Sequence, residues 1–271
     1  MSILSQIITT KHQEIQLLPD LQKLSKNLQI TPNNPIIKTN FSSKQPIIIA
    51  EIKPKSPSVG TIYPDLDIAK IVNNFEKIGA NAISVLTDKQ YFGGSNEMLQ
   101  QVQTLTKKAK NLPILRKDFI VDTKQIYETK HLGANLILFI VKILTLDQLV
   151  EFVTLSLSLN LQPLIEINTI DEAKTLQNAL NIVQIWIQEE VKNLPNLKQN
   201  FDQIIVSVNN RNLETLELDL MTAKKLFDYL PKNFLKFSLS GIMTKDDLKF
   251  ITDLGYDGVL IGTGIAQNNL F

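Results

Sequence analysis

The sequence alternates short apolar runs with amphipathic segments along most of its length, and this alternation constrains the fold more than any other feature. Uninterrupted apolar runs are typical of parallel strands that are buried on both faces. The predicted strands are 47–53, 82–87, 113–117, 136–141, 163–167, 204–209, 235–239 and 258–262. Apolar residues recur at helical spacing between these runs. The predicted helices are 67–78, 96–109, 123–132, 146–160, 170–180, 219–229 and 244–254.

Eight consecutive strand and helix units favour an α/β fold of the (β/α)8 type, a TIM barrel, in which the active site lies on the loops that follow the strands. We therefore expect a single domain over residues 1–271, and its 44% hydrophobic composition is enough for a large core. The alternative is a doubly wound open sheet. That fold requires a glycine-rich turn after its first strand, whereas here the strand runs into Lys53-Pro54-Lys55-Ser56.

Two segments lie outside the repeating pattern. Residues 1–45 are predicted to form an N-terminal helical extension, with an amphipathic helix at 2–17 and a short one at 20–26. Residues 168–203 are longer than one crossover helix requires. We interpret 182–203 as an insertion, an added helix and loop packed at the periphery.

Composition excludes several classes of function. The net charge of +1 provides no field that would recruit nucleic acid or an anionic membrane, so neither is expected as a partner. The chain has no Cys and only two His residues, which excludes a disulfide, a thiol nucleophile and a Cys-ligated metal. Catalysis must then use Lys, carboxylates and amides. No signal peptide and no apolar stretch of about 18 residues is found, so we expect a soluble, cytoplasmic protein.

Charged residues stand at the carboxyl ends of three predicted strands. Glu51 and Lys53 are two residues apart on the first strand and therefore point to the same face. Lys117 ends the third strand, and its neighbour Arg116 must face the opposite way, so one of the two is predicted to be a surface charge. The register of Lys117 is compatible with the inward face, which would leave the surface charge to Arg116. Glu166 ends the fifth strand. Taken alone, Lys117 is equally compatible with a solvated lysine, and Glu166 with a structural ion pair.

Asn209 and Arg211 follow the sixth strand. An Asn-Asn pair is an ordinary turn signal, but arginine is scarce in this chain, with only two Arg against 26 Lys. An arginine retained against such a bias suggests a need for its planar, two-pronged guanidinium, which suits an anion. Arg211 is therefore a candidate anion-binding residue.

Glycine is concentrated near the end of the chain. Ser240-Gly241 follows the seventh strand and Gly262-Thr263 follows the eighth, the positions where a barrel of this type binds phosphate through backbone N–H groups. A plain turn explains either pair alone. Together, in adjacent units, they favour an anion site.

Several strings, in the same order and on the same strands, resemble the indole-3-glycerol-phosphate synthase family. They are Ile49-Ala50-Glu51-Ile52-Lys53, Ser56-Pro57-Ser58, Ile83-Ser84-Val85-Leu86-Thr87-Asp88, Tyr91-Phe92, Gly94-Ser95, Leu115-Arg116-Lys117-Asp118-Phe119-Ile120, Leu164-Ile165-Glu166, Asn209-Asn210-Arg211-Asn212-Leu213 and Ser240-Gly241-Ile242. The resemblance covers nearly the whole chain. It implies a carbon–carbon lyase of tryptophan biosynthesis that converts 1-(2-carboxyphenylamino)-1-deoxyribulose 5-phosphate to indole-3-glycerol phosphate without a cofactor or a metal.

The resemblance also implies roles for individual residues. Lys117 would be the general acid at the ribulose carbonyl, and Lys53 would bind the substrate carboxylate and assist a later proton transfer. Glu166 would assist dehydration. The remaining implied residues are two that position these groups, Glu51 and Asn209, and six that bind substrate, Ser56, Arg211, Ser240, Gly241, Gly262 and Thr263. A small phosphorylated substrate is the implied partner, and association with other enzymes of the pathway is compatible with the family.

The chain departs from the family pattern at Leu239, where a glutamate is usual, and in Val206-Ser207-Val208, where a glycine is usual before Asn-Asn-Arg. The first departure motivates a second hypothesis, a degenerate barrel that binds a phosphorylated ligand or a partner without turnover. A third is a phosphoribosylanthranilate isomerase. That enzyme uses a Cys and Asp acid–base pair, so the absence of Cys argues against it.

Overall fold

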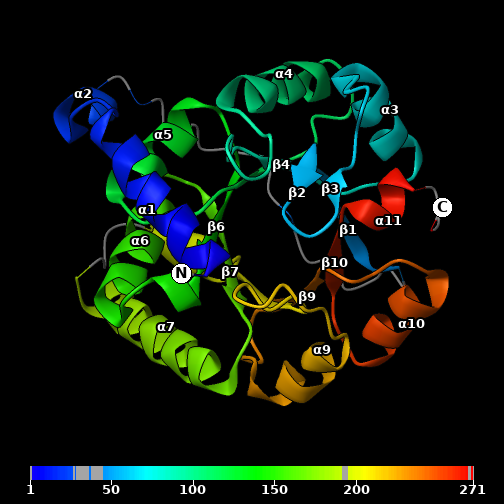
Figure 1. Ribbon diagram of the computed structural model, residues 1–271. Helices are drawn as coiled ribbons and strands as arrows, with labels where there is room; N and C mark the ends of the chain where they lie inside the picture. The colour runs from blue at the N-terminus through cyan, green and yellow to red at the C-terminus, as the bar shows by residue number, and fades with distance from the viewer. Residues whose placement is uncertain are drawn as a thin grey trace.

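The computed structural model describes residues 2–26, 28, 37, 45–190, 195–267 and 270, and its centre is a closed barrel of eight parallel strands (Figure 1). The predicted TIM barrel is confirmed, and each predicted strand overlaps an observed one. The barrel strands are β1 (Ile47–Ile52), β4 (Ala82–Leu86), β5 (Ile114–Lys117), β6 (Leu136–Ile140), β7 (Gln162–Ile167), β8 (Ile205–Asn209), β9 (Leu235–Leu239) and β10 (Gly258–Ile261). Their order is β1-β10-β9-β8-β7-β6-β5-β4.

Helices surround the barrel (Figure 1), and each except the last, which follows β10, lies between two successive barrel strands. They are α3 (Ile68–Lys77), α4 (Asn96–Lys107), α5 (Thr123–His131), α6 (Leu146–Ser158), α7 (Ile170–Glu190), α8 (Pro195–Phe201), α9 (Met221–Leu226), α10 (Lys245–Asp253) and α11 (Thr263–Ala266). A small hairpin, β2 (Lys55–Ser56) and β3 (Gly60–Thr61), follows β1. The described residues also include 3₁₀ turns at Val141–Ile143 and Phe227–Tyr229. Within the described ranges, no helix combines the length and the hydropathy of a bilayer-spanning segment.

The side chains of each strand alternate between two hydrophobic layers. Ile48, Ala50 and Ile52 of β1 face outward into the core formed with the helices, whereas Ile49 faces the barrel interior. Both faces are therefore buried, which is why the strands read as uninterrupted apolar runs. The alternation also directs Glu51 inward at the level above Ile49, toward the mouth of the barrel.

The predicted surface charge at Arg116 is wrong. Its side chain does face away from the barrel interior, but α5 covers that side of the strand. Arg116 is therefore only 3% exposed. Arg116 Nη2 lies 2.7 Å from Glu128 Oε2, and its Nη1 donates to Thr129 Oγ1 at 3.2 Å. In a barrel the outward face of a strand meets helices rather than solvent, so a charge there needs partners.

The helix predicted at 170–180 is longer in the structure. It continues as α7 to Glu190, because Val183 and Ile187 extend its apolar face into the core. The first part of the predicted insertion 182–203 is therefore the end of α7, and residues 191–194 lie outside the described residues. The added helix is α8, where Asn200 Nδ2 donates to Leu157 O at 3.1 Å and holds α8 against the end of α6.

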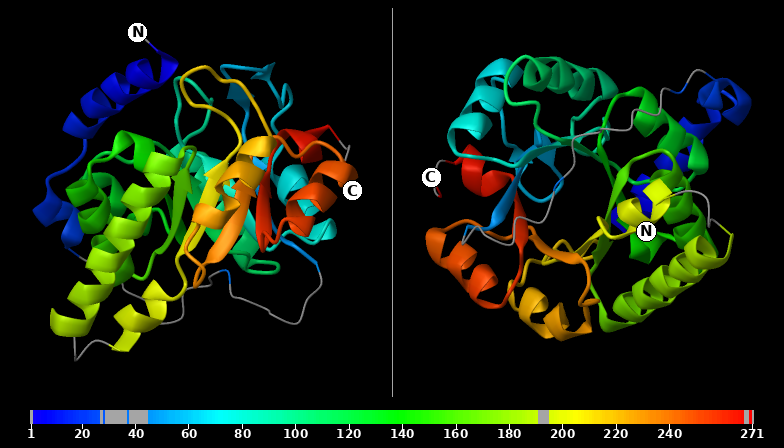
Figure 2. Two further views of the ribbon diagram at one scale, coloured as in Figure 1. Left: turned by 90° about the horizontal axis from the view of Figure 1, so that it is seen from below. Right: turned by 180° about the vertical axis from the view of Figure 1, so that it is seen from behind.

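The predicted N-terminal helix is confirmed as α1 (Ile3–Gln16), and the short helix as α2 (Leu21–Ser25). Figure 2 shows α1 at the same end of the barrel as the β2–β3 hairpin. Leu4 and Ile7 belong to the inner cluster together with residues of the barrel interior, so α1 covers part of the mouth. The rest of the predicted extension, residues 1, 27, 29–36 and 38–44, lies outside the described residues.

Candidate active site

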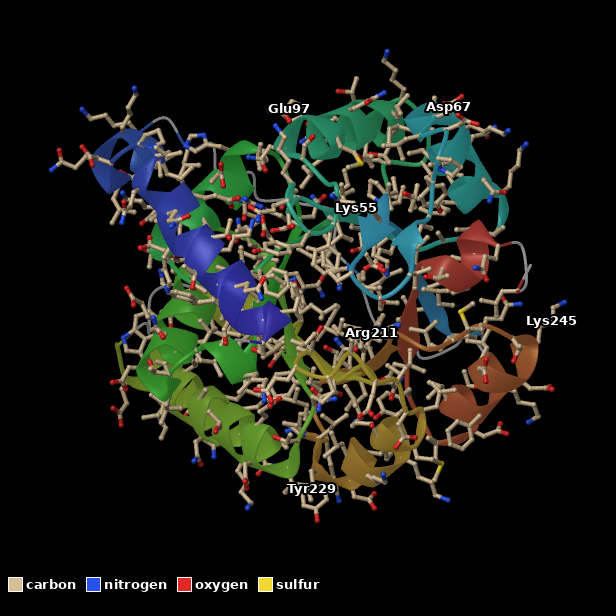
Figure 3. The ribbon with its side chains drawn as sticks, viewed as in Figure 1. Lys55, Asp67, Glu97, Arg211, Tyr229 and Lys245 are labelled. Atoms are coloured by element: carbon tan, nitrogen blue, oxygen red, sulfur yellow. The ribbon has the colours of Figure 1, made fainter. Side chains whose placement is uncertain are left out.

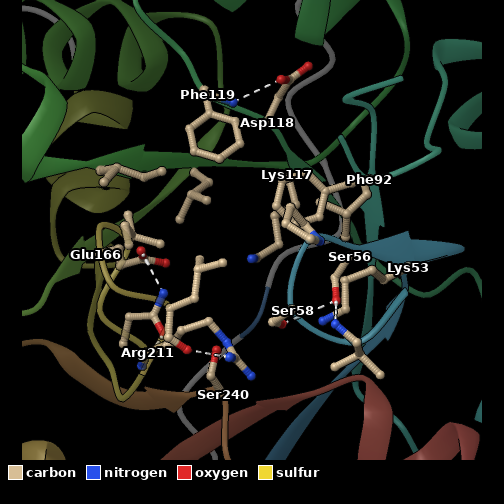
Figure 4. Close-up of a pocket in the computed structure, with 18 of the residues that line it drawn as sticks. Lys53, Ser56, Ser58, Phe92, Lys117, Asp118, Phe119, Glu166, Arg211 and Ser240 are labelled. Carbon is tan, nitrogen blue, oxygen red and sulfur yellow. Dashed lines mark hydrogen bonds between the residues drawn. The ribbon is translucent and has the colours of Figure 1, made fainter. Parts of the chain in front are cut away.

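A cavity opens at the carboxyl ends of the barrel strands, and most of the predicted site residues line it (Figure 4). It encloses about 720 Å³, part of which is open to solvent. Figure 3 places Arg211 near the centre of this mouth, while Tyr229 and Lys245 lie at the rim of the molecule. The predicted residues that line it are Lys53, Ser56, Lys117, Glu166, Asn209, Arg211, Ser240 and Thr263.

Glu51 lies directly behind the two lysines and holds both. Its Oε1 accepts from Lys53 Nζ at 2.7 Å, and its Oε2 lies 3.4 Å from Lys117 Nζ. The carboxylate is only 2% exposed, whereas each lysine keeps about a fifth of its side chain exposed to the cavity. Glu51 therefore fixes the two ammonium groups from below and leaves their other faces free for a substrate.

The charges in this cluster stabilise one another. Burial by itself would raise the pKa of Glu51, but the neighbouring ammonium groups of Lys53 and Lys117 outweigh it and hold that pKa at about 2. Burial likewise opposes the charge on Lys117, and the facing carboxylate of Glu51 raises the pKa of Lys117 despite it. Lys117 is thus protonated at neutral pH and can act as an acid.

Glu166 is in a different environment. It faces Lys117 across the cavity (Figure 4), and its Oε1 accepts a hydrogen bond from Asn209 Nδ2 at 2.9 Å. Its Oε2 has no hydrogen-bond donor among the described residues. Burial raises the pKa of this carboxyl group, and the attraction of Lys117 only partly opposes the rise. Such a carboxyl group is protonated more readily than an ordinary glutamate, which suits a residue that both accepts and donates a proton.

One wall of the cavity is aromatic. Phe92 and Phe119, here called the aromatic wall, line the cavity with their ring centroids 5.9 Å apart. Phe119 follows Lys117 by two residues, and Figure 4 shows both side chains at the cavity. Apolar rings beside two ammonium groups suit a flat aromatic ligand that carries an anionic substituent.

The opposite wall carries Arg211 and Ser240. Arg211 Nη1 donates to Leu216 O at 2.7 Å, which ties the loop after β8 together while the guanidinium still lines the cavity. Ser240 has a φ of 66°, an uncommon value for a residue other than glycine. Asn210 holds this turn, since its Nδ2 donates to Leu239 O at 3.1 Å and to Ser240 O at 3.0 Å.

Gly241 and Gly262 are near the cavity but are not among its lining residues. Gly241 has a φ of 86°, which a residue with a side chain would rarely adopt. A Cβ at Gly262 would lie 2.8 Å from Glu51 Oε1. A side chain at position 262 would therefore crowd the carboxylate that holds the lysines.

Sequence reasoning missed several residues of the site as candidates. Phe119 could have been found, because it shares the strand-end face of Lys117 by the alternation rule. Asn210 and Asn168 were hidden in polar turns, and their roles depend on contacts across strands. Asn168 Nδ2 donates to Asn209 O at 2.7 Å and so braces the residue that contacts Glu166. Only the folded barrel brings these partners together.

The cavity thus brings together two ammonium groups, a buried carboxyl group with a raised pKa, a guanidinium and two aromatic rings, a set of groups that suits acid–base chemistry on an anionic aromatic ligand. Among the residues that the structure describes, no group of three or more His, Asp or Glu side chains is placed to hold a metal ion.

Comparisons with known proteins point to one family. The model of the family described as Indole-3-glycerol phosphate synthase matches residues 4–198 and 182–270. A protein of that name from Thermoanaerobacter sp. (strain X514) is 41% identical over 215 residues, which cover 79% of this chain and 72% of that protein. Another, from Caldanaerobacter subterraneus subsp. tengcongensis, is 34% identical over 98% of this chain and 93% of its own length.

A similar protein from Leptospira interrogans, with the same name, is 36% identical over 96% of this chain and 90% of its own length. Among solved structures, an N-acetylmannosamine-6-phosphate 2-epimerase from Clostridium perfringens matches with a TM-score of 0.51 and 15% identity, over 81% of this chain and 87% of that one. At this identity the structural match concerns the fold alone.

Proposed function

The chain belongs to the indole-3-glycerol phosphate synthase family, and from this membership we propose that the cavity at the barrel mouth closes the indole ring with Lys117 as general acid. The protein is a carboxy-lyase of tryptophan biosynthesis. The observation that carries the assignment of residues is the arrangement of Lys53 and Lys117 on one buried carboxylate, Glu51, opposite Glu166.

Ring closure begins when the aromatic carbon attacks the ribulose carbonyl. The electron pair of the C=O bond moves to oxygen, and Lys117 donates a proton to it, which gives a hydroxyl group. The raised pKa of Lys117 keeps its amine protonated at neutral pH, so the proton is present when the alkoxide forms. A positioned acid of this kind contributes about 10²–10⁴-fold in rate, and its charge also stabilises the developing alkoxide.

Decarboxylation follows at the carbon that bears the carboxylate. Lys53 pairs with that carboxylate in the bound substrate and assists the later proton transfer. As CO₂ leaves, the electron pair of the broken bond passes into the ring system. Glu51 positions Lys53 and Lys117 for both steps, because each of its oxygens faces one ammonium group.

Dehydration completes the indole ring. The hydroxyl group formed in the first step leaves as water after protonation, and a proton is lost from the neighbouring carbon. Glu166 is suited to accept or donate this proton, since burial holds its pKa above the ordinary value. Asn209 orients the carboxyl group through its hydrogen bond to Glu166 Oε1.

The two ends of the substrate would lie on opposite walls of the cavity. The phosphate would lie against Ser240, Gly241, Gly262 and Thr263, with Arg211 and Ser56 contributing to binding. The aromatic ring would lie on the aromatic wall. This orientation is supported by the placement of Arg211 and Ser240 on one side and of Phe119 on the other (Figure 4).

The direct test is a fluorescence assay for the indole product with 1-(2-carboxyphenylamino)-1-deoxyribulose 5-phosphate as substrate. We expect turnover by the purified chain without an added cofactor. Binding of this compound without product formation would instead support the degenerate, ligand-binding barrel. Absence of both binding and turnover would contradict the proposed placement of the substrate.

Replacing Arg211 with Lys should raise KM about tenfold, the equivalent of about 1.4 kcal/mol of binding free energy. An ammonium group cannot reproduce the planar geometry in which one nitrogen of Arg211 donates to Leu216 O while the guanidinium still faces the cavity. Steady-state kinetics over a range of substrate concentrations measures the effect. A KM equal to that of the parent would mean that Arg211 serves the loop alone.

Replacing Leu239 with Glu should lower the free energy of unfolding by about 2–4 kcal/mol at pH 7, because it puts a new carboxylate into an apolar setting. Leu239 is 1% exposed and belongs to the inner core with Phe237 and Leu260. Urea unfolding measures the loss, and we expect no gain in kcat. A higher kcat with unchanged stability would show that the site accepts the carboxylate usual in the family.

A further inference from the structure

A buried lysine of α1 joins the N-terminal helix to two loops of the active site. Lys11 is 2% exposed, and its Nζ lies 3.0 Å from Asp88 Oδ2 and 3.0 Å from Asp118 Oδ1. It also lies 2.8 Å from Glu14 Oε2 in its own helix. Thus one ammonium group of α1 stands between the carboxylates that follow β4 and β5.

Each of these carboxylates organises one residue of the aromatic wall. Asp88 Oδ1 accepts from the backbone N–H of Phe92 at 3.1 Å and from that of Tyr91 at 2.7 Å. Asp118 Oδ1 accepts from the N–H of Phe119 at 2.8 Å. The backbone of each residue of the aromatic wall is therefore held by one of the two carboxylates that Lys11 pairs.

The pairing is needed because both carboxylates are buried. Asp88 is 0% exposed and Asp118 is 4% exposed, and among the described residues the contact of Asp88 Oδ2 is the ion pair with Lys11. Asp118 has further partners in Thr87 and Arg116. Without Lys11, Asp88 would have an unpaired buried charge facing a second carboxylate, and such an arrangement is unfavourable.

We propose that Lys11 is a positioning residue of the active site, which acts through Asp88 and Asp118 to hold Phe92 and Phe119 in place for the aromatic ring of the substrate. The inference rests on the proposed function for the identity of that ring. It gives α1 a specific part in substrate recognition. A second contact supports the docking of α1, since Thr10 Oγ1 lies 3.1 Å from Tyr91 Oη.

The test uses two probes that report on opposite walls of the cavity. The probe for the aromatic wall is 2-aminobenzoate, which carries the ring and carboxylate of the substrate, and the other probe is inorganic phosphate. Calorimetric titration of the full chain measures the Kd of each. For Lys11→Met we expect the Kd of 2-aminobenzoate to rise at least tenfold, while the Kd of phosphate changes less than twofold.

Hydrogen exchange of the free protein provides a readout that needs no ligand. The N–H groups of Tyr91, Phe92 and Phe119 should exchange faster in Lys11→Met than in the parent, because the carboxylates that accept from them are no longer fixed. Exchange of the strands on the far side of the barrel, such as β9, should not change. This contrast distinguishes local loosening from a general loss of stability.

Three further variants serve as controls. Lys11→Arg keeps the charge and should retain at least half of the affinity for 2-aminobenzoate. Glu14→Gln removes the half-exposed partner of Lys11 and leaves both aspartates paired, so it should behave like the parent. The double variant Lys11→Met/Asp88→Asn removes one of the unpaired charges, and it should recover part of the affinity that Lys11→Met loses.

Unchanged affinity for 2-aminobenzoate in folded Lys11→Met would overturn the proposal. An equal loss of affinity for both probes, with faster exchange throughout the barrel, would also overturn it and leave Lys11 with a structural role only. If Lys11→Met fails to fold, the double variant is compared with one more variant, Asp88→Asn alone. Equal affinities of these two proteins for 2-aminobenzoate would reject the role of Lys11. Failure of the parent in the indole assay would refute the proposed function but would leave the exchange result intact.

Discussion

Replacing Lys117 with Met is expected to lower kcat about 10³-fold while KM changes less than tenfold. In the proposed mechanism the ammonium group donates a proton to the ribulose oxygen only as the new bond forms, so its contribution is made in the transition state. Glu51 also accepts from Lys53 Nζ, at 2.7 Å in the parent, and this contact does not involve Lys117, so the site should keep its shape in the variant. Steady-state kinetics with the fluorescence assay measures both constants.

Lys245→Met is the matched control, because Lys245 is an exposed lysine at the rim of the molecule (Figure 3). It should leave both constants unchanged. If Lys117→Met instead raises KM and leaves kcat unchanged, Lys117 is a binding residue and not the general acid. Circular dichroism of both variants checks that the barrel is retained.

Replacing Glu166 with Gln should lower kcat about 10²–10⁴-fold and, at pH 7, make the protein more stable. The amide is nearly isosteric and its oxygen can still accept from Asn209 Nδ2, so the hydrogen bond at 2.9 Å in the parent has a counterpart. The amide cannot exchange the proton that the proposed mechanism assigns to this carboxyl group during dehydration. The variant also loses the cost of ionising a buried carboxyl group.

The gain in stability should depend on pH. Burial raises the pKa of Glu166 in the folded protein above its value in the unfolded chain, which is about 4.3. The folded state therefore holds the proton more tightly, and the parent loses stability as the pH rises from that unfolded value through the folded pKa. The Glu166→Gln variant has no such loss, so the two proteins should be equally stable below about pH 4 and should differ above the folded pKa.

Urea unfolding at a series of pH values measures this difference. Glu151→Gln is the control, because Glu151 is exposed on α6 and removing its carboxylate should change neither the rate nor the stability difference. If the free energies of unfolding of the parent and of Glu166→Gln differ by the same amount at every pH, the pKa of Glu166 is not raised in the folded protein.

The fold was predictable because it depends on repeated local patterns. Uninterrupted apolar strands between amphipathic helices are enough to indicate a parallel barrel, and strand alternation is enough to direct Glu51 and Lys53 to one face. The same reasoning was wrong for Arg116, because alternation predicts the direction of a side chain but not what covers it. The extent of α7 was also underestimated, since the apolar face past residue 180 was interpreted as an insertion.

The sequence by itself determined the strand ends and therefore which charged residues reach the mouth of the barrel. It could not determine which residues pair there, because each pair comes from strands that are far apart along the chain. Closure of the barrel places Lys117 of β5 beside Glu51 of β1, and docking of α1 places Lys11 between Asp88 and Asp118. The pKa values of Glu51 and Glu166 follow from these contacts and from burial. Two glutamates at equivalent strand ends thus differ in pKa because of the tertiary structure, which lowers the pKa of Glu51 and raises that of Glu166.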